Sequence, residues 1–193
     1  MQNISQPQLF EFKPKLPQGF SYHANFISRR EEIELLKYIQ TVNFGHLKIR
    51  DRESKRGIAG FGVEYSFETG EVTQGRNIPG FLFPLREKVA NWMGKKDEEF
   101  EEVLITEYQP GSAISWHKDA SPFDVVVGIS LLNSCKFKLR RGEKGNWENI
   151  DLEVEPRSAY VMNGVARWQW QHSIPPAKAL RYSITFRTLR KNN

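Results

Sequence analysis

Residues 103–132 read VLITEYQPGSAISWHKDASPFDVVVGISLL. Two apolar runs in this stretch, Val103–Tyr108 and Val125–Leu132, each have the length of one buried strand, and Pro110-Gly111 between them is a turn signal. The rest of the chain has the same texture, with short runs separated by glycine and proline. These further runs are Lys136–Arg140, Ile150–Val154, Ala159–Met162, Arg167–His172 and Arg181–Arg187. Many short strands at regular spacing predict a β-sandwich or jelly roll.

Helical patterns precede this region. Ser28 and Glu31 have the spacing of a capping box, and apolar residues then recur at helical spacing as far as Val42. A second helix is expected at about 81–93, with Gly94 as its C-terminal stop. We expect both helices to pack against the outside of the double sheet, which makes the fold class α+β, mainly β, with a jelly-roll core.

One domain is expected. Residues 1–19 are interrupted by prolines and are interpreted as a loose arm, whereas residues 20–193 are interpreted as a single domain. That domain begins with a short strand from Phe20 to Ile27. Its jelly-roll core is expected at about 103–190.

The composition excludes several classes of protein. The 193 residues are 39% hydrophobic and 12% aromatic, which is typical of a globular chain and not of a disordered one. The single cysteine, Cys135, excludes an internal disulfide framework and a thiolate metal site, and it fits a reducing cytoplasm. The net charge of +5 favours polyanionic partners without identifying one. No apolar run reaches the length of a membrane span, so we expect a cytoplasmic monomer that does not bind membranes.

A possible metal site lies in the quoted stretch. His117 and Asp119 are two residues apart, so on an extended segment their side chains point to the same side. His172 closes a later predicted strand that can deliver a third ligand. Two histidines and one carboxylate form the facial triad of non-haem Fe(II) oxygenases, which leaves three coordination positions open. A His-x-Asp pair also occurs by chance on protein surfaces, and we interpret His23 and His46 as structural or solvated.

A possible anion site lies near the C-terminus. In residues 181–187, RYSITFR, the side chains of Arg181, Ser183, Thr185 and Arg187 share one face of a predicted strand. Two arginines on an inward face need anionic partners, and a dicarboxylate would supply them. Its distal carboxylate would take paired hydrogen bonds from Arg181, with Tyr108 as a further donor. The alternative is a basic edge strand whose arginines lie in water.

Together these residues resemble a known family. The order His117-x-Asp119, His172, Arg181-x-Ser183-x-Thr185-Phe186-Arg187, with the lead-in Thr106-Glu107-Tyr108-Gln109-Pro110-Gly111, is similar to the AlkB family of 2-oxoglutarate/Fe(II) dioxygenases. The likeness covers most of the chain from residue 20. It implies a double-stranded β-helix core that binds iron through His117, Asp119 and His172, and 2-oxoglutarate through Tyr108, Arg181 and Arg187. It also implies that dioxygen is consumed and that a methyl group on a base nitrogen is hydroxylated and leaves as formaldehyde.

Three positions depart from the family pattern. Thr106 and Ser183 stand where the family usually has asparagine; both keep a hydroxyl, so we expect them to remain in the co-substrate site. Ser121 stands where DNA-repair members of the family tend to carry an acid that contacts the damaged base. This departure leaves the identity of the base open.

The resemblance places a nucleotide-recognition lid at about residues 44–80. Arginines alternate there with aromatic residues, which suits phosphates and unstacked bases, and we expect Arg56, Phe61 and Tyr65 to bind substrate. Trp116, next to His117, is a further candidate for the substrate pocket. Alternatively these aromatic residues pack one face of a strand, as we expect for Trp168 and Trp170.

Three functions follow from the sequence. The first is oxidative dealkylation of nucleobases in single-stranded DNA or RNA, in repair or RNA modification, because a base in a duplex must first be flipped out. The second is the same chemistry on a protein side chain or a small molecule, which Ser121 keeps open. The third is a non-catalytic, basic jelly-roll binding module, which requires that the triad holds no metal.

Overall fold

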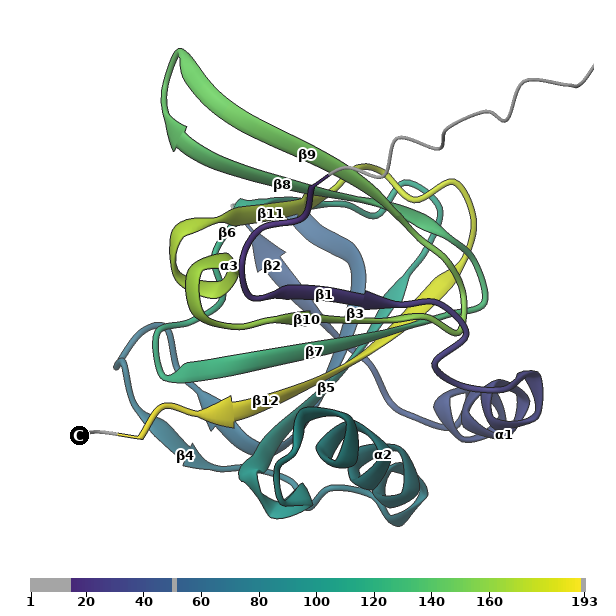
Figure 1. The fold of residues 1–193 in the computed structure, drawn as a ribbon. Coiled ribbons are helices and arrows are strands. Elements are labelled where there is room, and N and C mark those ends of the chain that lie inside the picture. Colours follow the sequence, from purple (N-terminus) through teal and green to yellow (C-terminus); the bar gives the residue numbers. More distant parts are fainter. Residues whose placement is uncertain (1–14, 50–51, 192–193) are drawn as a thin grey trace, which may run out of the picture.

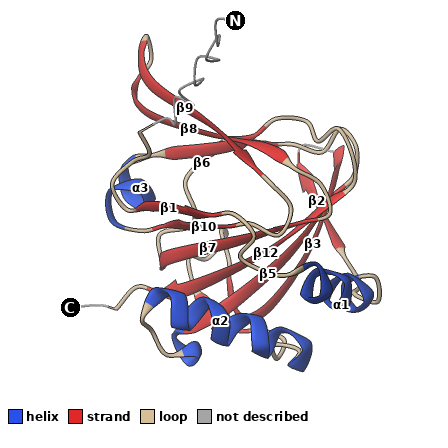
Figure 2. Ribbon diagram, turned by 45° about the vertical axis from the view of Figure 1, so that its right-hand side comes forward, coloured by secondary structure: helices blue, strands red, loops and turns tan. Residues whose placement is uncertain are grey.

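Two antiparallel β-sheets face each other in the computed structural model, which describes residues 15–49 and 52–191 (Figures 1 and 2). Within these residues the larger sheet has eight strands in the order β1-β10-β7-β12-β5-β3-β2, with β4 paired to β3. The smaller sheet has four strands in the order β6-β11-β8-β9. The strands are β1 Phe20–His23, β2 Gly45–Ile49, β3 Arg52–Tyr65, β4 Val72–Gln74, β5 Phe100–Tyr108, β6 Ile114–His117, β7 Phe123–Leu131, β8 Cys135–Glu143, β9 Asn146–Val154, β10 Ala159–Met162, β11 Gln171–Ile174 and β12 Arg181–Leu189. The predicted double-sheet, mainly β architecture is confirmed.

Helices α1 (Arg29–Ile39) and α2 (Phe83–Met93) lie against the face of the larger sheet that points away from the smaller one (Figure 1). The capping box is present, since Ser28 Oγ accepts from Glu31 N at 3.2 Å and Glu31 Oε2 accepts from Ser28 N at 2.7 Å. Gly94 ends α2 with a φ of 61°, a left-handed conformation that glycine adopts without strain. The short 3-10 helices are η1 Gly80–Leu82 and η2 Asp97–Glu99.

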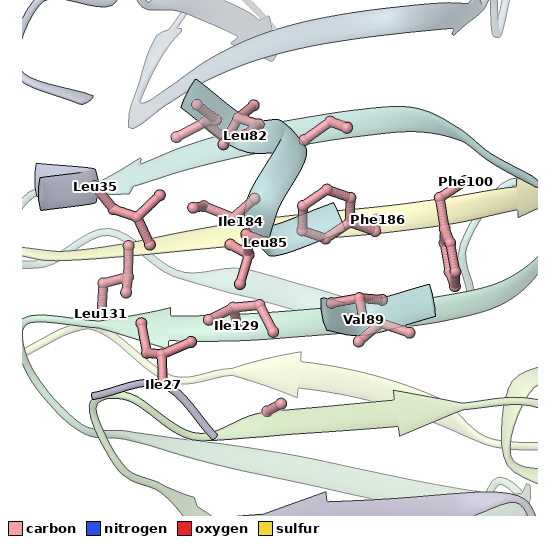
Figure 3. Close-up of a cluster of buried hydrophobic side chains, with 14 of the residues drawn as sticks. Ile27, Leu35, Leu82, Leu85, Val89, Phe100, Ile129, Leu131, Ile184 and Phe186 are labelled. Carbon is pink, nitrogen blue, oxygen red and sulfur yellow. The ribbon is translucent and has the colours of Figure 1, made fainter. Parts of the chain in front are cut away.

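A hydrophobic core fills the space between these helices and the larger sheet. Figure 3 shows Leu85 of α2 beside Ile184 of β12 and Val89 of α2 over β7, and Phe186 of β12 belongs to the same cluster. Each of these side chains is at most 5% exposed. Burial of four such side chains contributes about 1.5–3 kcal/mol each, which fixes β12 in the sheet and fixes which of its faces points inward.

Strand β12 shows the predicted alternation. Tyr182, Ile184 and Phe186 belong to the core under the helices, so the alternate residues from Arg181 to Arg187 face the space between the two sheets. That space holds a second apolar cluster, which includes Phe137 of β8.

The strand predicted at Arg167–His172 is wrong in its first half. The chain forms a short helix, α3 (Gly164–Gln169), and only then enters β11 (Gln171–Ile174). A six-residue run is too short to separate a strand from a helical turn by its pattern. Burial of Arg167, which is 1% exposed, provides the physical reason: its Nη2 donates to the carbonyls of Asp119, Ala120 and Phe123.

The segment at about 44–80 extends the larger sheet. Strand β3 pairs with β5 from Arg56 opposite Tyr108 to Gly62 opposite Glu102, and β2 and β4 pair with β3. Among the described residues, no helix has both the length and the apolar character required to cross a membrane.

Candidate active site

The predicted metal triad is assembled by the smaller sheet. His117 ends β6 and pairs directly with His172 of β11, and their ring centroids are 4.2 Å apart. Asp119 lies in the turn after β6, with its Oδ2 3.8 Å from Nε2 of His172. One ligand atom from each residue lies within 4.8 Å of the others. Three side chains from two adjacent strands and a turn therefore converge on one point.

The donor atoms fit a divalent iron ion. Arg187 donates to Oδ1 of Asp119 from Nε at 3.1 Å and from Nη2 at 2.7 Å, whereas the buried Oδ2 has no hydrogen-bond partner among the described residues. His117 Nδ1 lies 2.9 Å from the carbonyl of Ser115, which leaves its Nε2 for a metal. One carboxylate oxygen and two imidazole nitrogens are the donor set of the Fe(II) facial triad.

The electrostatics of the triad favour the protonation states that bind metal. Burial raises the pKa of Asp119, but the nearby positive groups, Arg187 first among them, together outweigh burial and hold this pKa well below its usual range. Burial lowers the pKa of His172 to about 4, although the nearby Asp119 raises it. An ionised carboxylate and a neutral imidazole need lose no proton when a metal binds at neutral pH.

The side chain of Arg167 donates hydrogen bonds to the backbone of the turn that carries Asp119. Its guanidinium Nη2 lies 2.7 Å from the carbonyl of Ala120 and 2.8 Å from that of Phe123. Three backbone carbonyls share this one donor group, so the turn after β6 has a fixed conformation. The sequence analysis missed this role, because Arg167 lies 48 residues from Asp119 and had been assigned to a strand.

Arg181 has the surroundings of a residue that binds an anion. It is 1% exposed and its Nη2 donates to Ser130 Oγ at 3.0 Å. Its Nε and Nη1 are buried and have no hydrogen-bond acceptor in the described part of the chain. The ring of Tyr108 stacks 4.4 Å from its guanidinium carbon. A buried cation with two unused hydrogen-bond donors is unfavourable unless an anion accepts from them. A bound dicarboxylate fits this environment, whereas the alternative of arginines in water does not.

The neighbours expected beside the co-substrate lie in the same region. Thr106 is directly opposite Ser183 across the β5–β12 pair, and both are buried. Thr106 and Tyr108 line the cavity described below. Arg187 lines the same cavity, where it binds Asp119 and also donates from Nη1 to Glu102 Oε2. The structure therefore places Arg187 as the group that orients the metal-binding carboxylate.

A cavity of about 620 Å³ opens between the two sheets in front of the triad. All three triad residues line it, together with Arg56 and Tyr65, whose contact with substrate stays a prediction. Phe67, an aromatic residue of the expected lid, also lines the cavity, and so do Glu64, Glu102, Phe137 and Tyr160, which the sequence analysis did not single out. A signal for Glu102 was available, since it shares a face of β5 with Leu104, Thr106 and Tyr108.

The expectation for Phe61 is wrong. Phe61 is 6% exposed and packs in the core beneath the helices, whereas Val63 and Tyr65 line the cavity. In a regular strand all three would share one face. Gly62 interrupts the alternation with a φ of 83°, and any Cβ there would lie 1.9 Å from the carbonyl oxygen of Glu101. This glycine therefore turns the strand and directs the residues after it toward the cavity.

Trp116 and Ser121 also lie away from the expected place. The centre of the Trp116 ring lies 4.4 Å from the guanidinium carbon of Arg140, and the centre of the Trp147 ring lies 4.2 Å from the same carbon. Ser121 is exposed, and the described lining of the cavity includes neither residue. The alternative of Trp116 as a strand anchor fits this packing.

Comparisons with known proteins agree with this geometry. The model of the 2OG-Fe(II) oxygenase superfamily matches residues 19–187. The mouse tRNA (carboxymethyluridine(34)-5-O)-methyltransferase ALKBH8 is 27% identical over 84% of this chain, but the match spans only 25% of the mouse protein. The Arabidopsis thaliana alkylated DNA repair protein ALKBH8 homolog is 25% identical over 83% of this chain and 51% of its own length. The chain thus spans a quarter to a half of these two relatives.

Two further matches cover most of both chains. The uncharacterized protein L905 of Acanthamoeba polyphaga mimivirus is 30% identical over 90% of this chain and 86% of its own. The solved structure of OsALKBH1 superimposes with a TM-score of 0.65 at 14% identity, covering 90% of this chain and all of that one, which shows a shared fold. The chain belongs to the 2OG-Fe(II) oxygenase superfamily and is an AlkB-like dioxygenase that depends on Fe(II), 2-oxoglutarate and dioxygen.

Proposed function

We propose that the protein oxidatively removes alkyl groups from nucleobases in single-stranded DNA or RNA. A pair of aromatic rings at the cavity carries this proposal. Tyr65 and Phe67 both line the cavity, with ring centroids 5.0 Å apart in an edge-to-face arrangement, and Phe67 is 84% exposed. An aromatic ring in this position offers a flat face for an unstacked base.

Basic side chains beside these rings support a polyanionic substrate. Arg56, Arg76 and Lys118 line the same cavity, and the whole chain carries a net charge of +5. Cations next to aromatic rings bind the phosphates and bases of single strands. Two relatives are named for tRNA and for alkylated DNA repair, which also supports a nucleic-acid substrate.

The chain's own residues prepare the reaction. Bound Fe(II) supplies, with 2-oxoglutarate and dioxygen, the oxidation of a carbon–hydrogen bond. His117, Asp119 and His172 would hold this ion at the cavity, and three protein ligands would leave coordination positions for 2-oxoglutarate and dioxygen. Arg181 holds the distal carboxylate of the co-substrate, and Phe137 stacks 5.3 Å from the ring of His172, where it limits the access of water.

Turnover on matched substrates tests the proposal. Purified protein with Fe(II), ascorbate and 2-oxoglutarate is expected to form succinate and formaldehyde in the presence of methylated single-stranded oligonucleotides. An unmethylated oligonucleotide is the control. Turnover on a methylated peptide or a small molecule, with none on any methylated oligonucleotide, would favour the second function drawn from the sequence. The enzyme assignment already contradicts the non-catalytic binding module.

A variant of Phe67 tests the proposed base contact. Each stacked base contributes about 1–3 kcal/mol in known cases, so Phe67→Ala is expected to weaken binding of a single strand roughly 5- to 150-fold. Phe83→Ala is the matched control, because Phe83 is also exposed (50%) but begins α2. Filter binding at several salt concentrations gives both affinities. Equal affinities in the two variants would remove the stacking role.

A further inference from the structure

One position in the larger sheet lacks a side chain and leaves room for a tyrosine ring. Gly128 of β7 lies directly opposite Tyr160 of β10 on one side and Thr185 of β12 on the other. An added Cβ at Gly128 would lie 2.3 Å from Cζ of Tyr160 and 2.5 Å from its hydroxyl oxygen. The hydroxyl end of the Tyr160 ring therefore lies over β7, and Tyr160 and Thr185 both line the cavity in front of the triad.

Aromatic neighbours fix the orientation of this ring. The ring centroid of Tyr160 lies 4.6 Å from that of Phe137 and 6.0 Å from that of Phe20, whose ring plane is within 1° of parallel. Phe137 in turn stacks against His172 of the triad, with ring centroids 5.3 Å apart. The Tyr160 hydroxyl thus has a defined position before any ligand enters, so a hydrogen bond from it costs little side-chain entropy.

The hydroxyl of Tyr160 is an unused hydrogen-bond donor. No hydrogen bond from it occurs within the described residues. Burial raises the pKa of Tyr160, the nearby Tyr108 and Asp119 raise it further, and the nearby Arg181 lowers it by less. The phenol therefore keeps its proton at neutral and alkaline pH. A half-buried donor without an acceptor is unfavourable, which favours a ligand that brings one.

The row of the sheet that contains Tyr160 lies between the two ends of the active site. Thr185 belongs to this row, and along β12 it lies between Arg181 and Arg187. Arg181 marks the expected place of the distal carboxylate, whereas Arg187 binds Asp119 at the metal site. A dicarboxylate that reaches from Arg181 to the metal therefore passes this row, where the hydroxyl of Tyr160 can donate to it.

We propose that the hydroxyl of Tyr160 donates a hydrogen bond to the metal-side carboxylate of bound 2-oxoglutarate, and that Gly128 makes room for this contact. Arg181 and Tyr108 are expected to supply the donors for the distal carboxylate, which leaves the phenol of Tyr160 for the opposite end. The contact is to the co-substrate, so it does not depend on which substrate the enzyme oxidises.

Two matched tyrosine variants test the contact. Tyr160→Phe keeps the ring and its packing and removes only the hydroxyl. Anaerobic calorimetry on the Fe(II)-loaded variant is expected to show roughly 10- to 150-fold weaker binding of 2-oxoglutarate, the loss of one hydrogen bond to a charged group. Tyr22→Phe is the control, because Tyr22 lies opposite Tyr160 in the sheet but its hydroxyl accepts from the backbone N–H of Glu155 at 3.1 Å. Its affinity for 2-oxoglutarate is expected to equal that of wild type.

Iron titration distinguishes a co-substrate contact from a structural role. In the absence of 2-oxoglutarate, Tyr160→Phe is expected to bind Fe(II) with the affinity of wild type, because the phenyl ring still packs against Phe137. Weaker iron binding by this variant would show that Tyr160 acts on His172 through Phe137, and the inference would be wrong. Unchanged affinity of Tyr160→Phe for 2-oxoglutarate would also reject it.

A double variant shows which end of the co-substrate the hydroxyl binds. Arg181→Lys weakens the grip on the distal carboxylate, so its effect and that of Tyr160→Phe act at opposite ends of the ligand. The two fold-losses in 2-oxoglutarate affinity are therefore expected to multiply in the double variant. A double variant that loses much less than this product would place both groups on the same carboxylate and overturn the metal-side assignment.

Discussion

Arg181 gives the sharpest test of the active site, because its role in the co-substrate complex and its effect on the free protein have opposite signs. In the free protein its guanidinium is buried with Nε and Nη1 lacking acceptors among the described residues, and the ring of Tyr108 offsets only part of this cost. With the dicarboxylate bound, the same two groups become donors in a charge-assisted pair. We therefore predict that Arg181→Met stabilises the free protein and abolishes its response to 2-oxoglutarate.

The expected magnitudes follow from the two unused donors. Each charge-assisted hydrogen bond contributes about 1.5–3 kcal/mol, so loss of both weakens 2-oxoglutarate binding by roughly 100-fold to 10,000-fold. Removal of a buried, unsatisfied group contributes about 1–3 kcal/mol to the free energy of unfolding of the free protein. For a chain of this size that raises Tm by roughly 2–10 °C. Arg181→Lys keeps the charge but loses the planar pair, so its loss of affinity is expected to lie between those of wild type and Arg181→Met.

Thermal unfolding with and without 2-oxoglutarate measures both effects in one assay. At a ligand concentration 100 times the Kd, wild type gains about 2.7 kcal/mol, whereas Arg181→Met at the same concentration gains almost nothing. Arg190→Met is the control, because Arg190 directly follows β12 but is exposed. Iron titration is expected to give the same affinity in all of these proteins. A destabilised Arg181→Met variant that still gains stability from 2-oxoglutarate would show that Arg181 is structural and refute the reasoning.

Three further predictions concern the metal, the packing and the pH dependence. His172→Ala is expected to weaken iron binding more than about 100-fold, the upper end of what outer-shell partners contribute, and equal iron affinity in variant and wild type would reject the triad. Gly128→Ala places a Cβ 2.3 Å from Cζ of Tyr160, so it is expected to lower the free energy of unfolding by about 1–3 kcal/mol in urea titrations, and an unchanged midpoint would contradict this packing. Partial burial raises the pKa of Glu31, but hydrogen bonds from Lys88 and the helix cap outweigh it and lower the pKa from its ordinary 4.5 to about 2. The stabilisation by Glu31 is therefore complete above the pKa of the unfolded chain and is lost as the pH falls to about 2, so the Tm difference between wild type and Glu31→Gln is expected to shrink over that range and not to grow.

Local patterns in the sequence predicted the parts of the site that lie on regular strands. The alternation in β12 placed Arg181 inside the sandwich, because a strand with one apolar face has a single way to bury it. The His-x-Asp spacing placed two ligands on one side of the turn after β6, and the triad is present. The capping box at Ser28 predicted where α1 begins. Each of these inferences needed only the neighbours within a few residues.

Contacts between distant segments determined the rest. Arg187 was expected on the co-substrate, which stays a prediction, whereas its contact with Asp119, 68 residues away in the chain, was not foreseen. Phe61 was expected at the substrate because the alternation was extended through Gly62, where the positive φ reverses the facing of the strand. Arg167 folds into a helix because three carbonyls of another segment need its donor. No local pattern encodes these partners.

Arg187 binds two carboxylates on other segments of the chain, Asp119 and Glu102. Its role therefore could not be assigned from the pattern of its own strand. It occupies Oδ1 of Asp119, and the buried oxygen left for the metal is Oδ2, which restricts this carboxylate to one ligand atom. The same guanidinium holds Glu102, so two buried carboxylates, one of them the metal-binding Asp119, share one positive charge. Binding of Fe(II) adds positive charge beside Asp119, which reduces its demand on Arg187. The ion pair between Arg187 and Glu102 is then expected to strengthen, because one carboxylate competes less for the guanidinium.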